Sequence, residues 1–130
     1  MSQSKGNFEE RRKFPRLDRN IPVKICGDEF DAVTETQNVS RAGAFCRVDE
    51  YIEPMTKLKV QLLLSMRKGG KRLQTKKVAC DGVVVRTEPA SNNEKGYYVA
   101  IFFSDISDKD ANVISDFIQF GVAKDQKEHE

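Results

Sequence analysis

The chain has 130 residues, which is enough for one domain but not for two of ordinary size. Apolar residues make up 38% of the sequence and charged residues 32%, a balance that suits one compact core and excludes wholesale disorder. The 22 basic and 20 acidic side chains nearly cancel, to a net charge of +2, which argues against a dedicated nucleic-acid-binding or membrane-binding protein.

The sequence also gives no support for several other classes. Its first residues hold no apolar segment typical of a secretory signal, and the most apolar run, 60–66, is too short to cross a bilayer, so we expect no membrane insertion. Cys26, Cys46 and Cys80 form no disulfide or metal-binding pattern, and reduced, buried thiols indicate a cytoplasmic protein. The single histidine, His129, offers little basis for histidine chemistry so close to the end of the sequence.

The middle of the chain alternates apolar and polar residues with the period of two that is typical of half-buried strands. We expect strands over 21–26, 29–36, 42–48, 58–64, 78–84 and 97–103, the second and third with weaker alternation. Gly69-Gly70 and Ser91-Asn92-Asn93 are predicted to form hairpin turns. Six short strands favour a small antiparallel barrel, because closure leaves no exposed edge.

The period changes to that of a helix near residue 107. Ser107 is predicted as the N-cap, and acidic residues follow where the helix dipole favours them. Gly121 is predicted to end the helix. Helix capping explains the nearby carboxylates, Asp105, Asp108 and Asp110, better than a metal site does. Four phenylalanines in and before the helix are expected to pack between barrel and helix: Phe102, Phe103, Phe117 and Phe120.

The fold class is therefore mainly β: a small six-stranded antiparallel barrel with one C-terminal α-helix that covers the open mouth or one face of the sheet. We expect one domain over residues 11–121, which includes an arginine-rich arm over 11–19. A flexible N-terminal segment, 1–10, and a polar C-terminal tail, 122–130, lie outside the domain.

Residues 57–87 hold nine basic side chains and one acidic side chain, and most of this charge lies in the segment 67–77. The simplest interpretation is a solvated hairpin tip. The alternative is a contact for an acidic partner or for a nucleic-acid backbone. No aromatic residues are interleaved with these charges, which argues against nucleic acid.

A basic cluster, Arg11-Arg12-Lys13-Phe14-Pro15-Arg16, comes just before the first expected strand. Proline disfavours helix at the residue before it, so this arm is predicted to be extended or turned. Arginine is planar and permanently charged; it can fork onto phosphate oxygens, stack on a base or pair with O6 and N7 of guanine. The simpler alternative is a solvated basic arm.

A second cluster, Asn38-Val39-Ser40-Arg41-Ala42-Gly43, falls between two expected strands. Asn38 and Ser40 can bond to nearby backbone, and Gly43 permits a positive φ or a close approach of another chain segment. Taken alone, the cluster predicts an ordinary turn. The functional alternative is a polar cradle whose amide and hydroxyl meet a base edge or a phosphate.

Together the two clusters resemble the signature of the PilZ domain family, which are receptors for the bacterial second messenger cyclic di-GMP. That signature has R-x-x-x-R ahead of the barrel, matched here by residues 12–16, and [D/N]-x-S-x-x-G further on, matched by residues 38–43. The resemblance extends from about residue 10 to residue 120. Ala100 is a departure, because the family often has glycine in that strand, and it is expected to narrow the ligand face slightly.

The resemblance implies six residues that bind cyclic di-GMP: Arg11, Arg12, Arg16, Asn38, Ser40 and Gly43. The two motif arginines would hold phosphates and guanines from the arm, and the amide and hydroxyl would meet guanine and phosphate groups from the barrel. The glycine would keep the surface free of a side chain. The extra arginine, Arg11, would accommodate a second, stacked ligand molecule.

The implied function is that of a non-enzymatic receptor whose arm becomes ordered when cyclic di-GMP binds, so that a downstream partner protein distinguishes the two states. The alternative is a protein-interaction barrel that binds no nucleotide. An enzyme is the least supported class, because the spacing suggests no nucleophile-and-base pair, P-loop or dinucleotide fingerprint.

Overall fold

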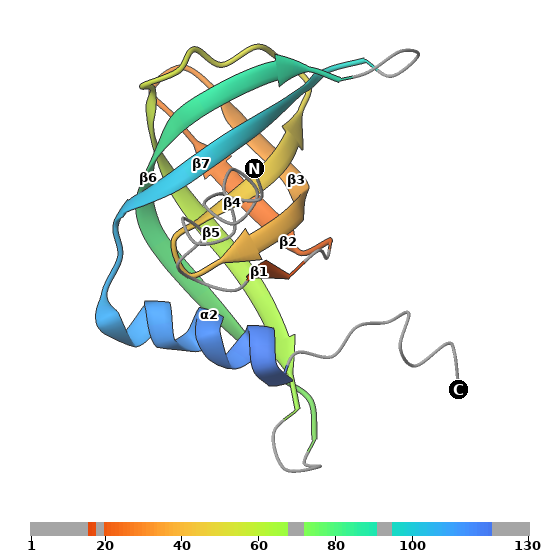
Figure 1. Cartoon of the computed structure of the whole chain (residues 1–130), viewed down its shortest axis with the longest axis vertical. Coiled ribbons are helices and arrows are strands. Elements are labelled where there is room, and N and C mark those ends of the chain that lie inside the picture. The colour runs from red at the N-terminus through yellow and green to blue at the C-terminus, as the bar shows by residue number, and fades with distance from the viewer. Residues whose placement is uncertain (1–15, 18–19, 68–71, 91–94, 121–130) are drawn as a thin grey trace, which may run out of the picture.

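The computed structural model describes residues 16–17, 20–67, 72–90 and 95–120. Within these ranges the chain forms seven strands and one helix (Figure 1). In chain order they are β1 (Arg16–Leu17), β2 (Pro22–Cys26), β3 (Asp31–Ser40), β4 (Gly43–Val48), β5 (Lys57–Met66), β6 (Gln74–Pro89), β7 (Tyr97–Asp105) and α2 (Asp108–Phe120).

Six of the strands close into an antiparallel barrel. The neighbours run β3-β2-β5-β6-β7-β4, and β4 pairs in turn with β3, which completes the ring. The two residues of β1 pair with Val39 and Ser40, the last two residues of β3. The predicted class, a six-stranded antiparallel barrel with a C-terminal helix, is confirmed.

The barrel is filled by the residues that the period of two predicted. Along β5 the burial alternates without a break, so that Leu58, Val60, Leu62 and Leu64 point inward. Burying one such side chain contributes roughly 1.5–3 kcal/mol relative to leaving it in water. Thr36 is the one buried polar side chain among the described residues, and its hydroxyl accepts a hydrogen bond from the backbone nitrogen of Ile21 at 3.1 Å.

Helix α2 lies across one end of the barrel (Figure 1). The side chain of Ser107 caps it, because the hydroxyl accepts a hydrogen bond from the backbone nitrogen of Asp110 at 3.0 Å. Ala111, Ile114 and Phe117 are buried on its barrel side. The predicted N-cap and the predicted cover over the barrel's mouth are therefore both present, whereas Gly121 lies outside the described residues.

β3 and β6 depart most from the ranges that the alternation predicted. β3 continues to Ser40, and β6 extends over Gln74–Pro89, well beyond 78–84 on both sides. The expected hairpin-turn residues 69–70 and 91–93 lie outside the described residues. The strands that flank them pair antiparallel, as hairpins require. Gly96 has a φ of 101°, and a Cβ there would lie 2.6 Å from the carbonyl oxygen of Val48, so this position next to β7 requires glycine.

A β-bulge in β3 turns part of that strand over. Thr36 points into the core, and strict alternation would send Asn38 and Ser40 inward as well. The pairing with β4 shifts between Thr36 and Asn38, so Gln37 is an extra residue in β3. One extra residue reverses the alternation, and Asn38 and Ser40 therefore lie on the outside of the barrel.

A second β-bulge has the same effect in β6. The inward residues of this strand run up to Val84, and the next residue in that series would be Arg86. The pairing with β7 shifts between Val84 and Arg86, which makes Val85 the extra residue. Arg86 therefore lies on the outer surface.

Candidate ligand-binding site

The two bulges border a single groove on the outside of the barrel. The groove has a volume of about 500 Å³ and crosses β3, β4, β7 and β6. Cross-strand pairing aligns one row of its residues, Asn38, Phe45, Ala100 and Arg86. A second, parallel row contains Ser40, Gly43 and Phe102. The site is thus assembled from four strands and not from one loop.

Small and aromatic residues alternate in the middle of the groove. Phe45 on β4 is paired with Ala100 on β7, and Gly43 on β4 is paired with Phe102 on β7, so the two small residues and the two rings each lie on a diagonal. Phe45 is stacked against Tyr98, with 5.3 Å between ring centroids and 16° between the ring planes. Phe102 is 50% exposed. The arrangement provides a hollow with aromatic faces at its side, which suits a flat, aromatic ligand.

The polar residues of the motif are placed at the β3 side of this groove. Among the described residues the Asn38 side-chain amide has no hydrogen-bond partner, so both its donor and its acceptor are available to a ligand. The Ser40 hydroxyl accepts a hydrogen bond from the backbone nitrogen of Ala42 at 3.1 Å. Its own proton is left to donate. Sequence reasoning placed the whole motif between strands, but Asn38 and Ser40 belong to β3, and Arg41 and Ala42 alone separate it from β4.

The packing of β4 against β7 requires glycine at position 43, in addition to the role in ligand binding that the family resemblance implied. A Cβ at this position would lie 2.3 Å from the carbonyl oxygen of Ile101 on β7. Its φ is not in the left-handed region, so the close approach of the two strands requires the glycine, and not an unusual backbone conformation. The missing side chain also deepens the groove.

Arg16 and Leu17, the described residues of the arm, lie beside the groove at its β3 edge. The backbone of Arg16 pairs with Ser40, and Leu17 pairs with Val39. The structure therefore brings the second motif arginine into register with the motif serine. Arg11 and Arg12 lie outside the described residues. Arg16 and Leu17 form a strand, which agrees with one of the two conformations predicted for the arm, extended or turned.

Three residues of the groove were missed by sequence reasoning, namely Arg86, Phe45 and Phe102. Phe102 was expected to pack between barrel and helix, and this is wrong, because Phe102 faces the groove while Phe103 and Phe117 are buried. The signal for Phe102 was its place between two inward residues, Ile101 and Phe103. No such signal marks Arg86, because the bulge before it is invisible in the pattern.

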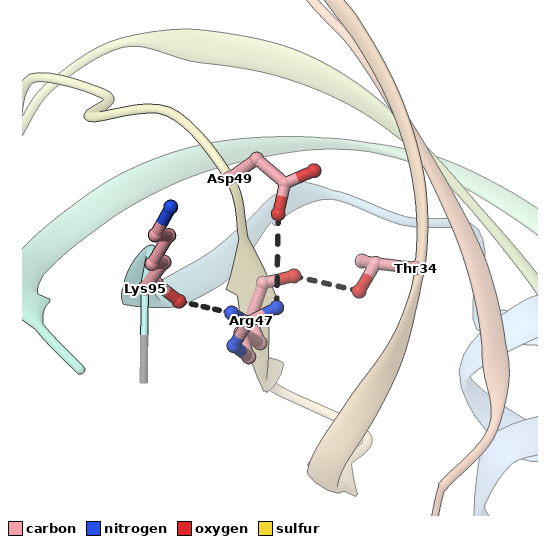
Figure 2. A network of polar contacts seen from close by, with 4 residues as sticks. All are labelled: Thr34, Arg47, Asp49 and Lys95. Atoms are coloured by element: carbon pink, nitrogen blue, oxygen red, sulfur yellow. Dashed lines mark hydrogen bonds and ion pairs between the residues drawn. The ribbon is translucent and has the colours of Figure 1, made fainter. Parts of the chain in front are cut away.

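A larger hollow, of about 1040 Å³, lies at the opposite ends of β3 and β4. It contains none of the motif residues, and its charged lining residues are mainly acidic: Asp28, Glu29, Asp31, Asp49, Glu50 and Glu53 stand against Arg47 and Lys57. Its arginine, Arg47, is already engaged: it contacts Asp49 at 3.7 Å and donates to the backbone carbonyl of Lys95, as Figure 2 shows. The Thr34 hydroxyl donates to the carbonyl of Arg47 at 2.6 Å. This hollow would repel an anionic ligand.

Two of the three cysteines, Cys46 and Cys80, lie in surroundings that disfavour reactive thiol chemistry. Burial raises the pKa of the Cys46 thiol to about 12, and burial with nearby carboxylates raises the pKa of Cys80 to about 12. Both thiols therefore stay protonated and inert at neutral pH. Within the described residues no group of His, Cys, Asp and Glu side chains is arranged to hold a metal ion, and no helix is long and apolar enough to cross a membrane.

An exterior groove with aromatic, amide, hydroxyl and guanidinium groups, built on a closed barrel, defines a ligand-binding domain. The family model of the PilZ domain matches residues 10–120. The chain therefore belongs to the PilZ domain family, which is a family of ligand-binding and adaptor domains and not of enzymes. No curated protein has a significantly similar sequence.

Among solved structures, the chain is similar to the Bacillus subtilis inhibitor of motility, MotI/DgrA. The two share 18% sequence identity, and the TM-score is 0.69. The match covers 84% of this chain and 49% of that protein, so this chain spans about half the length of its structural neighbour. At this level of identity the similarity supports the fold.

Proposed function

We propose that this protein is a cyclic di-GMP receptor that binds its ligand in the groove across β3, β4, β7 and β6. The observation that carries the proposal is the pairing register, which aligns Arg16 with Ser40 and Ser40 with Gly43, with Asn38 in the neighbouring row. The last residue of the first motif and the second motif, which are far apart in the sequence, thereby lie side by side at one edge of the groove.

The chemistry of the groove matches that of the ligand. Cyclic di-GMP carries two phosphodiester charges and two guanines, so it needs cations, hydrogen-bond partners for base edges, and surfaces for stacking. Arg12 and Arg16 supply the cations, and Asn38 and Ser40 supply the polar contacts. The hollow at Gly43 receives the base without a steric barrier.

The arm is the moving part of the proposed receptor. The backbone of Arg16 pairs with Ser40 at the groove's edge, so the end of the arm that joins the barrel lies beside the proposed binding site. Fixing each backbone residue costs roughly 1–2 kcal/mol of conformational entropy, which the new phosphate and guanine contacts must exceed. A partner protein that recognises the closed arm would read the signal.

Arg11 supports a stoichiometry of two. A second guanine stacked on the first needs a further cation, and Arg11 directly precedes the first motif arginine. We propose two stacked cyclic di-GMP molecules for each chain. The domain of this receptor extends over 11–121, and its thiols, which form no disulfide, suit the reducing cytoplasm.

Isothermal titration of the full chain with cyclic di-GMP tests the receptor function, with GTP and the linear dinucleotide as competing probes. We expect Arg12→Ala and Arg16→Ala each to weaken binding by about tenfold to 150-fold, equivalent to roughly 1.4–3 kcal/mol. Arg72→Ala is the matched control, since Arg72 is exposed and lies outside the groove. Arg11→Ala should lower the ligand-to-protein ratio from two towards one.

The alternative function is a protein-interaction barrel without a nucleotide. The two functions differ in the wild-type titration alone: a receptor releases or absorbs heat with cyclic di-GMP, and an interaction barrel does not at any concentration up to the millimolar range. Unchanged affinity in both motif variants, in a wild type that does bind, would remove the arm from the site.

A further inference from the structure

The end of the groove opposite the arm holds a cation that no motif accounts for. Arg86 lies on β6, three strands away from Asn38 in the same cross-strand row, which corresponds to about 14 Å at the usual strand spacing. It lines the groove, and its side chain is 64% exposed. A ligand that fills the groove from the motif edge therefore ends at Arg86.

The direction of Arg86 is set by the backbone. Without the extra residue Val85, the inward alternation of β6 would carry this guanidinium into the core, where a charge is costly. The β3 bulge turns Asn38 and Ser40 outward at the other edge by the same means. Two separate bulges thus deliver side chains to one groove, and bulges commonly re-aim side chains at binding sites.

The positive charge of Arg86 is partly neutralised by a neighbouring carboxylate. Its Nε lies 3.3 Å from the Oε2 of Glu88 on the same strand. The pairing occupies the Nε side and leaves the two terminal nitrogens as a fork. A carboxylate so close weakens the attraction for a phosphate, whereas a neutral base edge with two acceptors still fits the fork.

We propose that Arg86 reads a guanine edge of cyclic di-GMP, donating to O6 and N7 while the base lies in the hollow beside Phe102. This inference rests on the proposed receptor function and assigns a guanine contact to β6, a strand that carries neither motif. The fork geometry distinguishes this role from general charge attraction, because lysine has the charge without the planar pair of donors.

A titration cycle with two ligands and three variants tests the proposal. The ligands are cyclic di-GMP and its 7-deazaguanine analogue, in which the N7 acceptor is replaced by carbon. We expect Arg86→Ala and Arg86→Lys to bind cyclic di-GMP about 5- to 100-fold more weakly than the wild type. The affinity lost on changing from cyclic di-GMP to the analogue should be smaller in both variants than in the wild type. Arg72→Ala, an exposed arginine outside the groove, should behave as the wild type does.

Glu88→Gln separates a base contact from a phosphate contact. If Arg86 reads a base, removing the neighbouring carboxylate changes the affinity by less than about threefold; if it binds a phosphate, the affinity rises more strongly. Three results would each overturn the proposal. The first is wild-type affinity in Arg86→Lys, and the second is a loss of affinity for the analogue in Arg86→Ala that is as large as in the wild type. The third is a large gain of affinity in Glu88→Gln. Absence of binding by the wild type would overturn the receptor function itself, which is a distinct result.

Discussion

The guanidinium of Arg41 donates a hydrogen bond from Nη1 to the hydroxyl of Ser115, at 3.2 Å, although the two residues are 74 positions apart in the sequence. Arg41 lies in the two-residue turn between β3 and β4, inside the second motif, and Ser115 lies on α2. The turn in the middle of the second motif is therefore hydrogen-bonded to the helix that covers the end of the barrel.

Ser115→Ala tests how much this contact stabilises the fold. The hydrogen bond is partly buried, and its loss should lower the free energy of unfolding by about 0.5–1.5 kcal/mol. Asn112→Ala is the control, because Asn112 is exposed on the same helix and has a similar helix propensity. Equal unfolding midpoints in urea for the two variants would mean that the contact contributes nothing.

Asn38→Ala and Ser40→Ala are expected to differ in stability although both weaken ligand binding. The Asn38 amide has no partner among the described residues, so its removal should leave the free energy of unfolding within about 0.5 kcal/mol of the wild-type value. Ser40 accepts a hydrogen bond from the turn, and Ser40→Ala should cost about 0.5–1.5 kcal/mol of stability. Titration with cyclic di-GMP beside urea unfolding gives both quantities. A Ser40→Ala protein as stable as Asn38→Ala would show that the turn does not need the hydroxyl.

Gly43→Ala is expected to destabilise the barrel before any ligand is added. The new Cβ would lie 2.3 Å from the Ile101 carbonyl oxygen, and a backbone atom cannot rotate away. Separating β4 from β7 should cost about 1–3 kcal/mol, as overpacking usually does. Ala100→Gly, in the same groove, is the contrasting variant and should slightly widen the ligand face. Thermal unfolding measures the first effect, and a normal melting temperature for Gly43→Ala would contradict it.

The buried thiols predict a loss of stability at alkaline pH. Folding raises the pKa of Cys46 and Cys80 from 9.0 to about 12, so above pH 9 the unfolded chain releases protons that the folded chain retains. Stability from these groups is complete below pH 9 and falls as pH rises towards 12, by up to about 1.4 kcal/mol per pH unit for Cys46 and by less for Cys80, which solvent screens more. Urea unfolding between pH 8 and about pH 11 checks this. The double variant Cys46→Ala, Cys80→Ala should have the flatter profile, and parallel profiles would contradict the assignment.

The strands and the helix were predictable from the sequence because each follows a simple period. Leu58 to Leu64 alternate as a half-buried strand must, and Ser107 carries the N-cap signal in its residue type. The motif residues were found through their family resemblance. Arg86 was not found, because its position in the series after Val84 predicts an inward side chain, and the bulge at Val85 depends on pairing with β7 that no local pattern records. For the same reason Asn38 and Ser40 were expected in a turn when they belong to β3.

Asp31 in the acidic hollow and Asn38 in the groove are seven positions apart on β3, which corresponds to roughly 20 Å of extended chain once the bulge is taken into account. At physiological ionic strength this separation exceeds two Debye lengths of about 8 Å, so the repulsion between the carboxylates and a dianion in the groove is largely screened. In dilute buffer, where the Debye length reaches about 30 Å, their repulsion extends over the whole barrel and opposes the pull of the arginines. Lowering the salt concentration strengthens the attraction by the arginines and the repulsion by the carboxylates together. It should therefore increase the association rate of the ligand far less here than on a uniformly basic surface.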